Sequence, residues 1–344
     1  MSDDITSLGA LDLSAAIHAR QVSCTEVMQA YLARIDRLNP GINALISLKS
    51  PETLLADARQ MDELAARGQW LGWMHGMPQA IKDLAATRDI RTTYGSPLYR
   101  DFQPTEDSLI VERVRRAGAI VIGKTNTPEF GLGSQSYNPV HGVTRNAYDP
   151  ALCAGGSSGG AAAALAARLL PVADGSDMGG SLRNPAAYNN VFGFRPSAGR
   201  VPKYPVPEAF IEQLGVEGPM GRSVPDVARL LATQAGPDPR APLSRSDDPA
   251  VFALPLEAPM RGLRVGWLGD LEGYLPFEPG ILELCEQGLK ALADIGCEVQ
   301  ASSLGFAPQR LWEMWLTLRS CVVAGGRWDD YADPARRADR KSVV

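Results

Sequence analysis

The sequence predicts an α/β fold in which a central sheet is covered by helices on both faces. Short apolar stretches typical of buried strands alternate with longer stretches of helical pattern along most of the 344 residues. Two glycine-rich loops, at residues 155–160 and 175–181, each lead into a helical stretch. The composition, 45% hydrophobic and 21% charged, is that of a globular chain large enough to bury a core without disulfides.

Residues 1–70 are expected to form a mainly helical segment. Ser23 and Glu26 fit a capping box before an amphipathic run, and Asn39-Pro40-Gly41 is expected to stop that helix. The next region, residues 71–220, begins with a short apolar run that carries Lys82 near its end. Helices are expected over residues 27–38, 53–67 and 108–117, and strands over residues 42–48, 77–84 and 119–122.

The second half is expected to continue the alternation after a break. Residues 236–260 are rich in Pro, Asp and Ser and predict a surface excursion, and residues 261–344 predict a partial carboxy-terminal α/β region. The whole chain, 1–344, is predicted to be a single domain. Helices are expected over residues 161–170, after residue 181, and over 223–233, 281–295 and 309–323, with strands over 262–268 and 297–302.

Charge and cysteine usage exclude several classes of function. The net charge of −5 argues against a nucleic-acid partner, and no apolar stretch is long enough to predict a membrane span. The five cysteines are scattered without a C-x-x-C pair, so neither a zinc site nor a disulfide framework is expected. The acidic start predicts no signal peptide. We therefore expect a cytoplasmic protein without a cofactor or metal.

A match to the phosphate-loop pattern G-x-x-x-x-G-K-T occurs at residues 118–125. In a true phosphate loop the strand precedes the glycines, whereas here the residues between the glycines are themselves the β-branched run. We interpret this match as a buried strand that ends in a turn, and we regard nucleotide binding as a distant alternative.

A match to the nucleophile elbow G-x-S-x-G surrounds Ser157. That fold places its triad in the order Ser, acid, His, but no histidine follows His141. Other triad orders remain open, because convergent sites do not follow sequence order. None of the three histidines has neighbours that indicate a catalytic base.

Two serines, Ser157 and Ser181, lie 24 residues apart in the two glycine loops. One helix and one strand can return the chain to the same edge of a sheet over that length, so that two helix N-termini point at one place. Gly179 and Gly180 allow several backbone N–H groups to face one oxygen, as in an oxyanion hole. A serine needs a base, and Lys82 is the best candidate because an apolar run carries it towards the core, where burial lowers a lysine pKa.

At these residues the chain resembles the amidase-signature family. The resemblance rests on residues 154–160 and 175–186, and on flanking stretches at residues 76–83, 123–130, 133–139, 193–196 and 199–202. It is dense between about residues 71 and 220, the signature core. It implies a mixed, largely parallel sheet covered by helices, and hydrolysis of a carboxylic amide C–N bond.

The resemblance also implies roles for individual residues. Ser181 would be the nucleophile that forms an acyl-enzyme, Ser157 would relay protons to neutral Lys82, and the peptide bond before Ser157 would be cis. Backbone N–H groups from Met178 through Ser181, including those of Gly179 and Gly180, would hold the oxyanion. Tyr137 and Asn138 are candidates for lining the substrate pocket. A homodimer is one candidate assembly, and the substrate would be a small-molecule amide.

The resemblance leaves alternatives for the function. Members of the family are usually longer, so the chain is expected to lack the carboxy-terminal part of the fold. One alternative is a glutaminase-type subunit that passes ammonia to a tRNA-charging partner. Another is a catalytically inactive, truncated member that keeps the fold.

Overall fold

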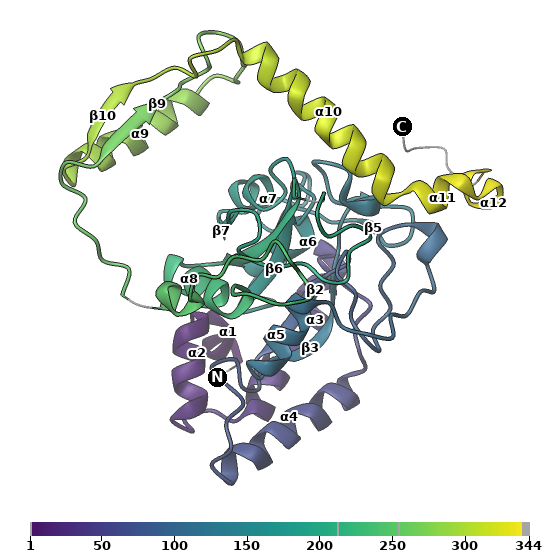
Figure 1. The fold of residues 1–344 in the computed structure, drawn as a ribbon. Helices are drawn as coiled ribbons and strands as arrows, with labels where there is room; N and C mark the ends of the chain where they lie inside the picture. Colours follow the sequence, from purple (N-terminus) through teal and green to yellow (C-terminus); the bar gives the residue numbers. More distant parts are fainter. Residues whose placement is uncertain (1, 212, 254, 339–344) are drawn as a thin grey trace. The chain divides into compact units, whose positions relative to one another are not determined.

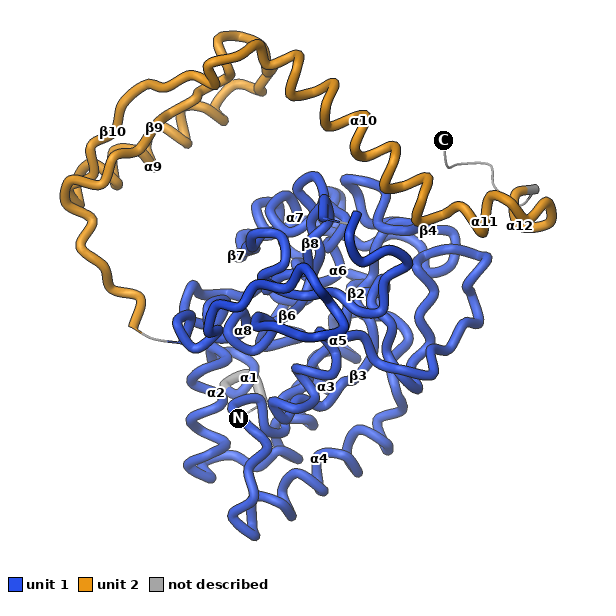
Figure 2. The backbone as a smooth tube through the Cα atoms, viewed as in Figure 1, with its two compact units in different colours: residues 1–254 blue, residues 255–344 orange. Residues whose placement is uncertain are grey.

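The computed structural model describes residues 2–211, 213–253 and 255–338. The described chain divides into two compact units, residues 1–254 and residues 255–344 (Figure 2). The first unit contains both glycine loops and Lys82, and the second contains the carboxy-terminal α/β region. The prediction of a single domain over the whole chain stays a prediction.

The first unit mixes helices with short strands, so the α/β class is confirmed (Figure 1). Its α-helices are α1 (Ser2–Ser7), α2 (Ala10–His18), α3 (Cys24–Ile42), α4 (Pro51–Ala66), α5 (Leu109–Arg116), α6 (Gly159–Ala166), α7 (Arg183–Tyr188) and α8 (Val224–Gln234). Its strands are β1 (Leu45–Ile46), β2 (Pro78–Lys82), β3 (Ile120–Thr125), β4 (Tyr137–Asn138), β5 (Gly142–Val143), β6 (Val172–Asp177), β7 (Phe192–Gly193) and β8 (Val216–Gly221).

Two three-stranded sheets organise this unit. In the first, of order β1-β3-β2, β2 runs parallel to β3 and β1 runs antiparallel to it. In the second, of order β6-β8-β7, both pairings are antiparallel. Strands β4 and β5 form a separate two-stranded sheet. The described strands thus form small sheets with both kinds of pairing, and β2 and β6, which carry residues of the candidate site, belong to different sheets.

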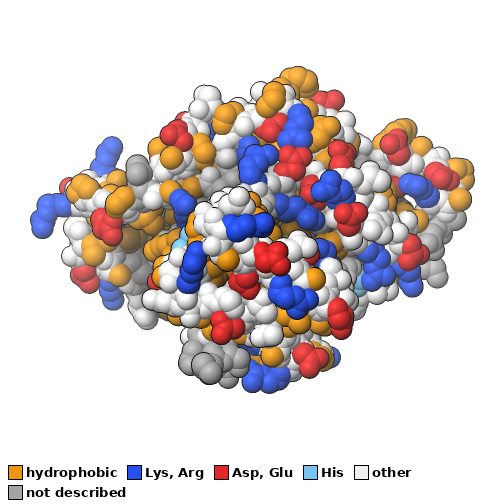
Figure 3. All heavy atoms as spheres, turned by 90° about the horizontal axis from the view of Figure 1, so that it is seen from below, with side chains coloured by type: hydrophobic (Ala, Val, Ile, Leu, Met, Phe, Trp, Pro, Cys, Tyr) orange, Lys and Arg blue, Asp and Glu red, His pale blue; other side chains and the backbone are white. Residues whose placement is uncertain are grey.

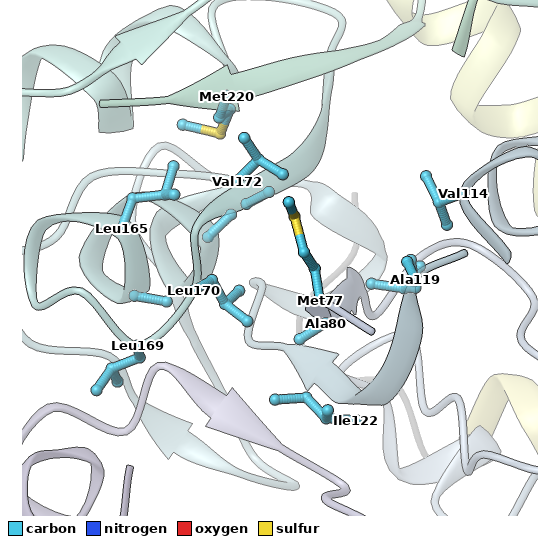
Figure 4. Close-up of a cluster of buried hydrophobic side chains, with 14 of the residues drawn as sticks. Met77, Ala80, Val114, Ala119, Ile122, Leu165, Leu169, Leu170, Val172 and Met220 are labelled. Atoms are coloured by element: carbon cyan, nitrogen blue, oxygen red, sulfur yellow. The ribbon is translucent and has the colours of Figure 1, made fainter. Parts of the chain in front are cut away.

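The core between these sheets is apolar. Met77, immediately before β2, lies among Leu170, Val172 and Met220 in the close-up of the core (Figure 4). Helix α6 is buried along its length except at its last residue, because glycine, alanine and leucine make up its whole sequence. An alanine surface lets backbones approach closely, and the result is a packed support beneath the first glycine loop.

Three local features differ from the expectation. Helix α3 continues through Pro40 to Ile42 and ends at Asn43, whose φ of 56° is left-handed. Pro40 cannot donate the N–H that would bond to the carbonyl oxygen four residues before it, and the helix ends two residues later. The strand expected over 42–48 is only Leu45–Ile46, and β8, which pairs with β6 along its full length, was not predicted. The capping box at Ser23 is confirmed.

The second unit is a β-α-β arrangement followed by helices. Strands β9 (Arg264–Trp267) and β10 (Glu298–Ala301) pair in parallel and are connected through α9 (Ile281–Asp294). Helices α10 (Pro308–Gly326), α11 (Trp328–Ala332) and α12 (Pro334–Ala338) follow. No side chain of α9 or α10 is buried. No helix in the described part of the chain is long and apolar enough to cross a membrane.

The surface of the described residues carries both signs of charge. Lys and Arg side chains alternate with Asp and Glu side chains across the face drawn in Figure 3, with apolar side chains between them. No large area of one sign covers that face. This mixture fits the mild net charge of the sequence.

Candidate active site

Strand β2 carries Lys82 into the interior. All five residues of β2 are buried, and the Lys82 side chain is only 1% exposed. The apolar residues that precede it draw the strand into the core, and the parallel pairing with β3 fixes its position. The sequence-based expectation that this lysine enters the core is therefore confirmed.

The Lys82 amine contacts hydroxyl groups from both glycine loops. Its Nζ lies 2.8 Å from Ser157 Oγ, 2.8 Å from Ser158 Oγ and 3.0 Å from Ser176 Oγ. None of the ion pairs among described residues includes Lys82. The amine is thus surrounded by neutral oxygens, which stabilise a charged amine less than a carboxylate does.

Burial lowers the pKa of Lys82 from 10.5 to about 7. Nearby carboxylates, with Asp174 first among them, act in the opposite direction but do not outweigh the loss of solvation. A pKa near neutrality means that a large fraction of the molecules carry an uncharged amine at physiological pH. Such an amine can accept a proton from a hydroxyl group.

The first glycine loop presents Ser157 to the lysine. Gly155 has a φ of 70°, a left-handed conformation that favours glycine, and the Gly156–Ser157 peptide bond is cis, as the resemblance implies. A Cβ on Gly156 would meet the backbone of Gln135. The Gly159 N–H, at the start of α6, donates to Ser136 Oγ at 3.0 Å. Close backbone packing therefore fixes the position of the serine.

The second glycine loop is held by Asp177. The Asp177 carboxylate accepts hydrogen bonds from the backbone N–H groups of Gly180 and Leu182, and it pairs with the guanidinium groups of Arg183 and Arg195. Burial alone would raise the pKa of Asp177, but the hydrogen bonds from Arg183 and the backbone outweigh it, so this pKa lies below its ordinary value. The carboxylate is a rigid brace for the turn that leads to Ser181.

The two loops meet through the backbone. The Ser158 N–H donates to the Ser181 carbonyl oxygen at 3.2 Å, which brings the second loop beside the residues that contact Lys82. In the described part of the chain, the N–H groups of Met178, Gly179 and Ser181 make no hydrogen bond to protein, whereas the Gly180 N–H is taken by Asp177 Oδ1 at 2.8 Å. Three backbone N–H groups of this loop are therefore without a hydrogen-bond partner among the described residues, and the binding of an oxyanion by this loop stays a prediction.

The two predicted pocket residues differ in their surroundings. Tyr137 is 62% exposed. Asn138 is buried, and its amide donates to Asn126 and Thr127 and accepts from backbone N–H groups of the following turn. The Asn138 amide is thus fully used inside the loop. A role for either residue in lining a pocket stays a prediction.

The structure also accounts for the phosphate-loop match and for the histidines that a Ser-His-Asp triad would need. Residues 120–125 of the phosphate-loop match form the buried strand β3, and its Lys124 is buried as well. His18, His75 and His141 bond to Ser14, Met61 and Thr93, and none of them contacts Ser157 or Ser181. No group of three metal-ligating side chains occurs among the residues that the structure describes.

Sequence reasoning missed two contacts of the lysine. The Ser176 hydroxyl was not singled out, although it directly precedes Asp177 in the second loop. Ser158 was not named as a partner of the lysine, yet its Oγ is as close to Lys82 Nζ as that of Ser157. No periodicity or motif marks such contacts, because they depend on how two loops from different parts of the chain meet.

Comparison with known proteins extends these observations. A family model described as Amidase matches residues 26–332. The chain is 40% identical to the A subunit of the glutamyl-tRNA(Gln) amidotransferase of Acidothermus cellulolyticus over 86% of this chain and 58% of that protein. It is 41% identical to the protein of the same name from Thermus thermophilus over 87% of this chain and 61% of that protein. The chain thus spans about three fifths of the length of these relatives.

Solved structures agree in fold. A bacterial aryl acylamidase of the amidase-signature family matches with a TM-score of 0.88 and 29% identity, over 97% of this chain and 70% of that one. The peptide amidase from Stenotrophomonas maltophilia matches with a TM-score of 0.74 and 33% identity, over 86% of this chain and 62% of that one. Because the family model matches most of its length, this chain belongs to the amidase-signature family.

Proposed function

We propose that this protein cleaves the C–N bond of a carboxylic amide through an acyl-enzyme on Ser181. The observation that carries the proposal is the buried Lys82 amine, which lies 2.8 Å from Ser157 Oγ and forms no ion pair with a described residue. Neutral Lys82 draws the proton of Ser157, Ser157 takes the proton of Ser181, and the Ser181 oxygen attacks the amide carbonyl.

The remaining steps release the amine and the acid and restore the protons of Ser157 and Ser181. The carbonyl oxygen becomes an oxyanion, for which Met178, Gly179 and Ser181 offer backbone N–H groups. The proton held on Lys82 passes back through Ser157 to the leaving nitrogen, so that the C–N bond breaks and the amine departs. Water then donates a proton along the same route, attacks the ester and releases the carboxylic acid.

For the substrate we propose the side-chain amide of glutamine, with the chain acting as one component of an amidotransferase. Both sequence relatives described above are named as amidotransferase A subunits, and this supports a glutaminase-type role better than a free-standing amidase. The solved relatives named as aryl acylamidase and peptide amidase support the second candidate, hydrolysis of small aryl or peptide amides. Partner subunits belong to the first candidate only.

A fluorophosphonate probe tests the chemistry without knowledge of the substrate. The probe labels a serine only when its oxygen is activated, so we expect labelling of the wild type and none of Ser181→Ala or Lys82→Met. Ser303→Ala, in the second unit, serves as a matched serine control that keeps labelling. A folded wild-type protein without labelling would contradict the proposal and favour the inactive alternative.

Release of ammonia separates the two substrates. We expect turnover of glutamine that increases when partner subunits and charged tRNA are added. Turnover of a panel of aryl and peptide amides, with none of glutamine under either condition, would replace the first candidate by the second.

A further inference from the structure

A second buried titratable group, the carboxyl group of Asp174, lies against the backbone of Lys82. Asp174, in the middle of β6, is 2% exposed, and its Oδ2 accepts a hydrogen bond from the backbone N–H of Lys82 at 3.1 Å. Its other oxygen, Oδ1, is buried without any hydrogen-bond partner in the described chain. A buried carboxylate that uses only one of its two oxygens is costly, so the fold retains an unfavourable group next to its central lysine.

The place of Asp174 follows from the sheet topology. Strand β2 pairs with β3, and β6 pairs with β8, so no backbone ladder connects β2 with β6 although the two strands pack together. In a continuous sheet, a backbone carbonyl oxygen of the neighbouring strand would accept the Lys82 N–H. Here the carboxyl group of Asp174 accepts it instead. This contact fixes the main chain at the point where the lysine side chain begins.

Other charged groups near Lys82 are already engaged. Lys124, on β3, donates to Ala85 O and Thr87 Oγ1, and Asp83 accepts from Thr93 and from the Gly95 N–H. Helix α6, which also packs on β2, has no titratable side chain. The charged groups that act on Lys82 are Asp174 and Asp177 on β6, Glu217 on β8, and Lys203, and those that act on Asp174 are Lys82 itself and Lys124 on β3. Asp83, which directly follows β2, acts on Lys124.

Asp174 differs from Asp177, which pairs with two arginines, because it forms no ion pair with a described residue and lies against the lysine's own backbone. Burial lowers the pKa of Lys82, and the charge of Asp174 is the strongest influence that raises it again. Burial also raises the pKa of Asp174, which the Lys82 N–H and the charge of Lys124 partly offset. The two groups are electrostatically coupled in a dry interior.

We propose that Asp174 is a positioning residue for the amide hydrolysis proposed above: it anchors the backbone at Lys82, and in its ionised form it keeps the buried amine basic enough to accept a proton. A general base works best when its affinity for a proton matches the operating pH. Without Asp174, the amine would lose its proton more readily but would be a weaker base.

The Asp174→Asn variant should show two effects of defined sign. The asparagine can still accept the Lys82 N–H through its amide oxygen, so the backbone anchor is kept while the charge is removed. We expect the acidic limb of kcat/KM to move to lower pH by on the order of one unit. We also expect the plateau rate at high pH to fall. A residue that only supports the fold would lower the rate without moving the limb.

Asp226 provides a matched control. It is also 2% exposed, its Oδ1 accepts the backbone N–H of Leu11 at 2.9 Å, and its Oδ2 is buried without a partner in the described chain. It lies on α8 and is not among the groups that act on Lys82. Asp226→Asn therefore repeats the chemical change of Asp174→Asn at a comparable site and should leave the titration of Lys82 unchanged.

The decisive measurement is the NMR titration of lysines labelled with ¹³C at Cε in the full chain, because it needs no turnover. The chain has six lysines, and the Lys82→Met variant identifies the signal of Lys82. In Asp174→Asn we expect this signal to titrate at lower pH than in the wild type, and in Asp174→Glu close to the wild-type midpoint. If Asp174→Asn does not fold, Asp174→Ser carries the same test.

The outcomes separate this inference from the proposed function. An unchanged Lys82 midpoint in Asp174→Asn, or an equal shift in Asp226→Asn, overturns the role of Asp174. A Lys82 signal that shifts as expected supports the electrostatic coupling. If Lys82→Met at the same time keeps full fluorophosphonate labelling, the proposed function fails and the positioning role fails with it, although the coupling is real.

Discussion

Replacing Lys82 by methionine should make the protein more stable at neutral pH and abolish its activity. Methionine has nearly the same length but no charge, so it fits the space without an amine that must lose its hydration. The folded state holds the pKa of Lys82 at about 7, whereas the ordinary value is 10.5. Between these two values the unfolded chain binds the proton more tightly than the folded protein does.

The sign and size of the effect follow from proton linkage. Stability rises with pH wherever the unfolded state binds more protons, so the wild type gains stability as the pH rises from about 7 towards 10.5. One pKa unit corresponds to about 1.4 kcal/mol. From about pH 7 to about pH 9, the wild type should therefore gain on the order of 2 kcal/mol relative to Lys82→Met, which carries no such group.

Urea unfolding of both proteins at the two pH values measures this difference. Other titrating groups, including buried Lys124, are present in both proteins and cancel to first order. Lys290→Met, at an exposed position of α9, is the matched control and should show no such dependence. A difference in the free energy of unfolding between wild type and Lys82→Met that stays constant from about pH 7 to about pH 9 would refute a lysine of depressed pKa.

Three further predictions follow from the loops around this lysine. Asp177→Asn should destabilise the protein by about 3 kcal/mol and remove fluorophosphonate labelling, because it breaks a buried charged network. In urea unfolding, the difference in free energy of unfolding between wild type and variant should vanish as the pH falls through the lowered pKa of Asp177. Gly160→Ala should cost about 1–3 kcal/mol in thermal unfolding, because its Cβ would collide with the backbone of Asn126. Ser176→Ala removes one of three hydroxyls that contact Lys82, so kcat/KM for the amide should fall roughly 5- to 10-fold, and an unchanged value would exclude a role for this hydroxyl.

The sequence predicted those parts of the site that local patterns control. An apolar run that ends in a lysine predicted the burial of Lys82, because such a run stabilises the fold only when it enters the core. The glycine loops before α6 and α7 were predicted for a similar reason: glycine permits a left-handed turn that other residues resist, as at Gly155 and Gly180. These features depend on a few neighbouring residues, and a single sequence contains them in full.

The sequence did not predict the contacts that depend on packing between the sheets. Asp174 and Lys82 are 92 residues apart, and an aspartate followed by glycine and serine, as in the run Val-Ala-Asp-Gly-Ser-Asp, is typical of a loop. Strand β8 was missed because its Gly and Pro residues are unfavourable in strands, and tertiary pairing with β6 overrides that preference. The pattern Asn-Pro-Gly indicates that a helix ends nearby but does not fix its last residue. The end of α3 was therefore placed before Pro40, although the helix continues to Ile42.

A neutral lysine at this site carries a thermodynamic cost that the rest of the unit must offset. Removing an amine from water costs several kcal/mol when no carboxylate pairs with it, and the total stability of a protein is only about 5–15 kcal/mol. An ion pair between Lys82 and Asp174 would reduce that cost but would also hold the amine in its charged form. The structure instead places the carboxylate against the backbone of Lys82 and hydroxyls around its amine. This arrangement makes the protein less stable, but it leaves the amine able to accept a proton. Variants that stabilise the site should therefore lose activity.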